Sequence, residues 1–262
     1  MRFPDLTAER REALREHAPG RVTPAHQVWL EAPLAPALGL AARLTEGGAL
    51  APGLRAEVRH LVIRAAARAL EHHPWLNDFL LRSGEVQRNP QVVVRVALDA
   101  EGRAAFCVVP DPGRRPLEEV VAEIAAREVE ERVAGVRRAI RLARFQRSRP
   151  LFTWLVGEGA LGSLLWLRDR LPPLERRLRR NLRRGGTIGL LDLGPHGVLG
   201  ASGTLLACRS ASLLLAAPRP AHGGPCLPLG LVYDARLFEA HEAVGFLREV
   251  IELLAEPEAR LA

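Results

Sequence analysis

Three segments in the last third of the chain set our expectation for the fold, beginning with Gly185-Gly186-Thr187-Ile188-Gly189-Leu190-Leu191-Asp192-Leu193-Gly194. The second is the apolar run around Leu213 to Pro218. The third is Leu231-Val232-Tyr233-Asp234-Ala235-Arg236-Leu237-Phe238-Glu239-Ala240, which a helical pattern follows. Short apolar runs bounded by glycine, proline or a turn are typical of buried strands. We therefore expect a core sheet whose last strand leads into a final helix.

The earlier part of the chain alternates strand patterns with helical patterns. Strands are predicted at Thr23–Ala32, Val92–Ala97 and Ala104–Val109, and helices at Pro36–Leu44, Leu54–His73 and from Pro116 to about Phe145. Further on we expect strands at Thr187–Leu193, Leu199–Cys208, Ser212–Ala216 and Leu229–Asp234, a Pro/Gly loop at Arg219–Pro228 and a helix at Glu242–Leu254. These elements predict an α/β domain in which helices flank a mixed β-sheet.

The basic residues are unusual, because all 37 of them are arginines and the formal net charge is +7. Without lysine there is no attachment site for lipoate or biotin, no Schiff-base residue and no phosphate-loop lysine. We therefore expect no covalently bound cofactor. Any acyl carrier that the protein uses must belong to another molecule.

The cysteine and histidine patterns give no sign of a metal site. Cys107, Cys208 and Cys226 lack metal-ligand spacing, and their odd number argues against a disulfide framework. The adjacent His72 and His73 point in different directions at a helix end, so we interpret them as structural. Because Met1–Gly20 is charged and lacks an apolar signal segment, we expect a cytoplasmic protein with reduced thiols and no metal.

In the order in which they occur, the three segments resemble the catalytic domain of the dihydrolipoamide acyltransferase (E2) components of 2-oxoacid dehydrogenase complexes. The family pattern is G-T-F-T-x-S-N-L-G, then an N-P-P-x-x-A-I-L-like strand, then D-H-R-x-x-D-G. The run Glu71-His72-His73-Pro74-Trp75-Leu76-Asn77 and the closing Ala255-Glu256-Pro257-Glu258 are similar to two further family segments. The resemblance implies a chloramphenicol acetyltransferase-like (CoA-dependent acyltransferase) fold over residues 21–262, after an N-terminal arm at residues 1–20.

The resemblance also implies where the reaction should take place, and there this sequence departs from the pattern. In the family a histidine activates the thiol of CoA or dihydrolipoamide, and a hydroxyl of the facing subunit stabilises the oxyanion. Here Ala235 stands at the histidine position and Leu191 at the serine position. A general base contributes about 10²–10⁴ in rate, and an oxyanion donor about 10²–10³.

The structural residues of the pattern are still present in this sequence. Asp234 and Arg236 remain, and in the family they hold the catalytic loop by an ion pair. Asn77 and Gly194 also match family positions. Three histidines could supply a relocated base, namely His241, His196 and His222. We expect no metal ligand among these residues.

Residues 150–184 form an insertion relative to the family. An apolar segment with Trp154 and Trp166 precedes a helical pattern that has leucines on one face and arginines around it: Arg176, Arg177, Arg179, Arg180, Arg183 and Arg184. Such a segment suits a helical hairpin packed on its own or a neighbouring subunit, or a peripheral contact with an anionic membrane. Nucleic acid is disfavoured, because no aromatic platform or groove-reading motif accompanies the arginines.

These observations leave three hypotheses for function. The leading one is a non-catalytic homotrimer that binds or scaffolds and retains affinity for CoA, acyl-CoA or a lipoyl or other acyl carrier on another protein. The first alternative is an active CoA-dependent acyltransferase with a relocated base. The second is a membrane-surface or partner-binding module that uses residues 150–184.

Overall fold

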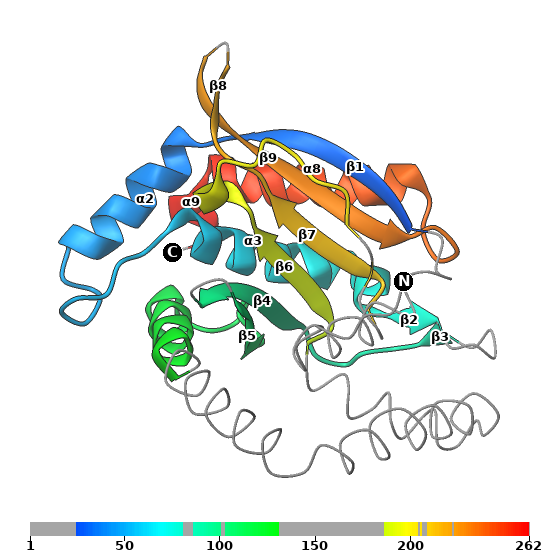
Figure 1. Cartoon of the computed structure of the whole chain (residues 1–262), viewed down its shortest axis with the longest axis horizontal. Helices are drawn as coiled ribbons and strands as arrows, with labels where there is room; N and C mark the ends of the chain where they lie inside the picture. Colours follow the sequence, from blue (N-terminus) through cyan, green and yellow to red (C-terminus); the bar gives the residue numbers. More distant parts are fainter. Residues whose placement is uncertain are drawn as a thin grey trace, which may run out of the picture.

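The computed structural model describes residues 25–80, 86–100, 103–130, 186–203, 205, 209–221 and 223–261. The expected N-terminal arm at 1–20 and the insertion at 150–184 lie outside these residues. Figure 1 shows a sheet with helices α3 (Val58–His72) and α8 (Ala240–Ala255) behind it. The predicted α/β class, a mixed sheet flanked by helices, is confirmed.

The main sheet contains seven strands and is mixed. Along the sheet the strands follow the order β1 (Ala25–Pro33), β9 (Gly224–Asp234), β7 (Ala211–Leu215), β6 (Ile188–Asp192), β4 (Val93–Ala100) and β5 (Arg103–Pro110), while β8 (Arg219–Ala221) pairs with β9. Strand β6 is parallel to both β4 and β7, and the other pairs are antiparallel. A separate ribbon pairs β2 (Phe79–Leu80) with β3 (Val86–Gln87).

Two of the remaining helices, α2 (Ala35–Glu46) and a helix over residues 117–130, occur close to the predicted places. Helix α9 (Pro257–Arg260) and the 3₁₀ turns η2 (Pro74–Asn77) and η4 (Gly194–His196) were not predicted. Helix α3 begins at Val58 rather than Leu54, because Glu57 and His60 close its first turn. The Glu57 backbone N–H donates to His60 Nδ1 at 2.9 Å, and the Glu57 side chain in turn accepts from the backbone N–H of His60.

The core lies between one face of the sheet and the helices. Alternate residues of the central strands point to this face, as the period of two in a strand requires. They pack with the buried sides of α3 and α8, and those strand residues are Val94, Val96, Leu190, Leu213, Leu215, Leu229, Leu231 and Tyr233. Burying each large apolar side chain contributes about 1.5–3 kcal/mol.

The second face of the sheet carries a row of residues that are in register across four strands. Trp29 of β1 pairs with Gly230 of β9, Gly230 with Leu214 of β7, and Leu214 with Leu191 of β6. A Cβ atom on Gly230 would lie 2.8–2.9 Å from carbon atoms of the Trp29 ring. Only glycine therefore lets the indole lie flat against β9.

The predicted strand at Leu199–Cys208 is wrong over the residues that the structure describes. These residues, 199–203 and 205, have no strand structure, and Gly203 and Leu205 lie on the second face of the sheet. Leu205 is buried there with Leu214 and Val232, and Gln27 Nε2 donates to the Ala201 carbonyl at 2.5 Å. Both edges of β6 and both edges of β7 are already hydrogen-bonded to neighbouring strands, so this apolar stretch covers the sheet instead of joining it.

The predicted loop at Arg219–Pro228 is also wrong, because this segment forms the β8–β9 hairpin. Gly223 and Gly224 make the turn with φ angles of 101° and 122°. Pro225 and Pro228 are tolerated inside β9 because neighbours use their carbonyls, which accept from the backbone N–H of Leu34 and Ala216. The hairpin projects from the sheet in Figure 1.

The close contact between Trp29 and Gly230 leads to a stability prediction. Gly230→Ala should lower the free energy of unfolding by about 1–3 kcal/mol, because the new methyl overlaps the indole ring. The double variant Gly230→Ala, Trp29→Leu should lose less than the sum of the two single changes. Gly39→Ala in α2, where a Cβ meets open space, is the control and should not destabilise. Urea unfolding of the wild type, the two single variants, the double variant and the control measures these effects, and simple additivity would contradict this account.

Buried His60 leads to a pH prediction. Burial, and then the charge of Arg59, lower the pKa of His60 from 6.5 to about 3. Between pH 6.5 and about 3, His60 is protonated in the unfolded chain and neutral in the folded chain. The free energy of unfolding should therefore fall with decreasing pH, by up to about 1.4 kcal/mol per pH unit. His60→Gln keeps an acceptor for the Glu57 N–H and should remove this slope. Thermal unfolding across this range tests it, and equal slopes for both proteins would refute it.

Candidate functional site at the end of strand β9

The turn after β9 is held by main-chain hydrogen bonds. The backbone N–H of Asp234, the last residue of β9, donates to the Ser210 carbonyl at 2.9 Å. The Asp234 carbonyl accepts from the N–H groups of Leu237 and Phe238, at 3.0 and 3.2 Å. Ala235 therefore lies in a fixed turn that leads into α8.

The side chain of Asp234 fixes the same turn through Arg236. Asp234 Oδ1 accepts from Arg236 Nε at 2.9 Å and Oδ2 accepts from a terminal guanidinium nitrogen at 2.6 Å, a bidentate pair. Oδ1 also accepts from the Arg236 backbone N–H at 3.1 Å. The Asp234 side chain is 4% exposed, and the hydrogen bond to it raises the pKa of Arg236. The loop is thus rigid without any contribution from residue 235.

Ala235 offers a half-buried methyl group at this rigid position. A methyl group cannot accept a proton, so this residue cannot act as a general base. The adjacent carboxylate of Asp234 is committed to Arg236. The turn is therefore held in place by hydrogen bonds, but Ala235 adds no acid–base group to it.

Leu191 does not lie near Ala235 within one chain. It stands in the row of Gly230, on the second face of the sheet, with 39% of its surface exposed. Asp234 lies four residues beyond Gly230 along β9, a distance of about 13 Å at about 3.3 Å per residue. Within one chain the two positions are therefore well separated.

The Gly186-Thr187 pair aligns β6 beside β4. Thr187 Oγ1 accepts from the Val93 N–H at 2.9 Å, and the Thr187 N–H donates to the Val93 carbonyl at 2.7 Å. Gly186 has a φ angle of 106°, and a Cβ there would lie 2.5 Å from the Cβ of Arg95. At the far end of β6 the Gly194 N–H donates to Asp192 Oδ1 at 2.9 Å. These motif residues therefore serve the placement of the strand.

Asn77 organises the segment that precedes the β2–β3 ribbon. Its side-chain amide donates to the carbonyls of Asn89 and Gln91, at 3.2 and 2.8 Å. Next to it, Asp78 Oδ1 accepts from the Asn89 N–H at 3.0 Å, and the Asp78 carbonyl accepts from the Ser210 hydroxyl. Because the Ser210 carbonyl in turn binds Asp234, this network connects Asn77 to the turn after β9.

The two candidate histidines that the structure describes do not converge on Ala235. His241 lies in the first turn of α8, is 77% exposed and has Nδ1 3.3 Å from Glu239 Oε2. His196 lies in η4, which follows the end of β6 that pairs with Leu215, whereas Asp234 lies beyond the opposite end of β7. His222 lies outside the described residues.

Another histidine, His26, lies beside the end of β9. It pairs with Tyr233 across β1 and β9, and the two rings meet edge to face with centroids 6.0 Å apart. Ala235 follows Tyr233 by two residues. No sequence signal points to His26, because only the β1–β9 register brings it to this end of the sheet.

The other predicted binding features lie elsewhere or are not described. All eight residues proposed for a membrane or partner contact, from Trp154 to Arg184, lie outside the described residues. Among the described residues, no three side chains are grouped as metal ligands. In the same part of the chain, no helix is both long and apolar enough to cross a bilayer.

Comparison with known proteins gives matches in structure and none in sequence. No family model and no curated protein sequence matches the chain. A probable dihydrolipoamide acetyltransferase from Listeria monocytogenes 4b F2365 superposes with a TM-score of 0.73 at 13% identity, covering 100% of this chain and 97% of the other. The dihydrolipoamide acetyltransferase of Azotobacter vinelandii, studied for the roles of a serine, a histidine and an asparagine in catalysis, gives 0.74 at 17% identity, covering 100% and 94%.

A third match is the truncated catalytic core of the 2-oxoacid dehydrogenase multienzyme complex from Thermoplasma acidophilum. It gives a TM-score of 0.71 at 14% identity and covers 98% of this chain and 100% of the other. At these identities the likeness concerns the fold. The chain has the fold of the acyltransferase catalytic cores of 2-oxoacid dehydrogenase complexes, as the sequence motifs predict.

Proposed function

We propose that this protein is a non-catalytic relative of the dihydrolipoamide acyltransferases, which binds CoA, acyl-CoA or an acylated carrier protein and presents it as a scaffold. The observation that carries the proposal is Ala235. The loop around it is fully built by Asp234 and Arg236, yet its centre is a methyl group. Such a site favours retained binding over retained chemistry.

The expected loss of rate supports this proposal. A thiol acceptor needs a base to become a thiolate, and the tetrahedral oxyanion needs a donor. Ala235 and Leu191 can supply neither. The two losses, about 10²–10⁴ and about 10²–10³, need not multiply, because such groups act as a unit.

The proposed assembly is a homotrimer with the ligand channel between subunits. Supporting it, Leu191 is partly exposed on the second face of the sheet and far along the strand from Ala235, so a facing chain is needed to bring the two positions together. In this proposal residues 21–262 form one cytoplasmic domain. The arm at 1–20 and the insertion at 150–184 are additions to that domain.

A working acyltransferase is the second candidate, and the position of His26 favours it. His26 lies across from Tyr233, close in register to the Ala235 position. In this alternative the imidazole of His26 takes the thiol proton.

Acetyl transfer between acetyl-CoA and dihydrolipoamide separates the two candidates. The wild type should not exceed the uncatalysed rate. The double variant Ala235→His, Leu191→Ser should gain activity of about 10²-fold or more, because it restores a base and a donor. Wild-type turnover that is lost in His26→Ala would refute the non-catalytic proposal and identify the base. Calorimetric titration of the wild type with CoA tests retained binding, and no binding would refute the scaffold.

The trimer is tested by sedimentation equilibrium. The wild type should sediment at three chain masses. Leu191→Glu should dissociate it, because a carboxylate would be buried in an apolar contact. Leu38→Glu is the matched control, since Leu38 is 46% exposed on α2, which packs with the helices α3, α8 and α9. A wild-type monomer, or equal behaviour of both variants, would contradict the proposed interface.

A further inference from the structure

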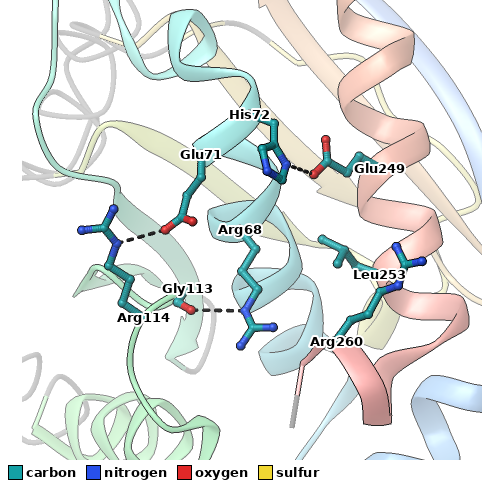
Figure 2. Close-up of a pocket in the computed structure, with 8 residues that line it drawn as sticks. All are labelled: Arg68, Glu71, His72, Gly113, Arg114, Glu249, Leu253 and Arg260. Carbon is teal, nitrogen blue, oxygen red and sulfur yellow. Dashed lines mark hydrogen bonds and ion pairs between the residues drawn. The ribbon is translucent and has the colours of Figure 1, made fainter.

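A groove of about 490 Å³ lies on the helical side of the molecule, between α3 and α8. One wall is the face of α3 that carries Arg68 and His72, which are one turn apart. The turn at residues 111–114 closes one side and α9 closes another. Figure 2 shows Arg68 between the Glu71–Arg114 pair on one side and Leu253 on the other. None of these residues belongs to the site at the end of β9.

The carboxylates of the groove already have cationic or imidazole partners. Glu71 accepts from Arg114 Nε at 3.0 Å. The two oxygens of Glu249 contact His72 Nδ1 at 2.5 Å and His73 Nε2 at 3.0 Å. The two adjacent histidines therefore converge on one carboxylate, and the prediction that they point in different directions is wrong. Contact with Glu249 raises the pKa of His72. The negative charges are therefore committed to the framework of the groove.

Arg68 differs from the other charged residues of the groove. It is half-buried, and its Nε donates to the Gly113 carbonyl, a neutral group, at 3.3 Å. Within the described part of the chain, no carboxylate lies within ion-pair distance of it. Arg64 lies one turn earlier on α3, and its pKa is lowered by burial and then by the positive charge of Arg68. A half-buried cation beside another cation is costly without an anion to compensate it.

The turn that carries Gly113 is tightly fixed against α3. Asp111 adopts a φ angle of 45°, and its carboxylate accepts from Gln91 Nε2 at 3.0 Å. A Cβ on Gly113 would lie 3.2 Å from the backbone nitrogen of Arg68. This close approach brings the carbonyl within 3.3 Å of Arg68 Nε, a contact that restricts the guanidinium. A restricted guanidinium loses less entropy when it binds a ligand.

The guanidiniums of the groove share one pattern of contacts. Arg68, Arg114 and Arg260 each use Nε for a contact within the protein, to Gly113, Glu71 and Glu256 respectively. Among the described residues, their terminal nitrogens make no hydrogen bond. The terminal pair of a guanidinium is the part that binds two oxygens of a phosphate.

We propose that this groove is a phosphate-binding site centred on Arg68, which takes inorganic phosphate or the phosphate of a small phosphomonoester. Arg68 supplies the guanidinium fork, and His72, one turn along the same face of α3, adds a further donor. The groove is larger than one phosphate ion requires, and Leu253 gives it an apolar patch. This proposal is independent of the proposed function.

Isothermal titration of the full chain with sodium phosphate, at ionic strength matched with sodium chloride, tests the site. The wild type should bind one phosphate per chain, and Arg68→Gln should weaken binding at least about tenfold. Arg68→Lys, which keeps the charge but loses the fork, should fall between them. Arg127→Gln removes an exposed arginine that pairs with Glu130 outside the groove, and should bind like the wild type.

A second titration with glycerol 3-phosphate distinguishes the two sources of phosphate. If glycerol 3-phosphate binds at least about tenfold more tightly than phosphate, the site is assigned to a phosphomonoester. If the two bind with equal affinity, the site is assigned to the free phosphate ion. The absence of saturable phosphate binding by the wild type would overturn the proposal. So would equal phosphate affinities of the wild type, Arg68→Lys and Arg68→Gln. Circular dichroism tests whether each variant is folded. If Arg68→Gln does not fold, the comparison of the wild type with Arg68→Lys still tests the proposal.

Discussion

Strand β9 is the element on which the rest of the structure depends, because it hydrogen-bonds on both sides. It pairs with β1 over nine residues and with β7 over five, and it also forms the β8 hairpin. Its alternate residues Leu229, Leu231 and Tyr233 enter the core. Its end, Asp234, sets the turn that carries the candidate site. A shift of one residue in its register would turn the core residues outward and displace that turn.

The order of strands and helices could be predicted because the hydrophobic period changes clearly between them. Three features in particular could not be predicted from the sequence. The 199–205 stretch has the composition of a strand, but the paired edges of β6 and β7 exclude it. The prolines of β9 suggest a loop, yet the hydrogen bonds made at Pro225 and Pro228 use only their carbonyls as acceptors, so the missing N–H groups do not prevent strand pairing. Helix α3 starts at a capping interaction between Glu57 and His60, and glutamate with histidine is an unusual pair for that role.

The residues of the candidate site and of the groove divide in the same way. The motif positions of the candidate site, Ala235 and Leu191, follow from the order of residues along the chain. His26 beside β9 and Arg68 in the groove could not be found in this way, because their roles depend on which strand or turn lies beside them. Arg68 is one of 37 arginines in the sequence, and only the fold places it in the groove between α3 and α8.

The β8–β9 hairpin has a consequence for how the protein behaves in concentrated solution. A strand that projects from a sheet offers unpaired N–H groups to which another molecule can add a strand, a common start of aggregation. Strand β8 is only three residues long, and its middle residue, Pro220, has no N–H to offer. Arg219 beside it carries a charge and pairs with Glu31. The exposed hairpin is therefore a poor template for strand addition, and the protein can extend it into solvent without promoting fibril growth there.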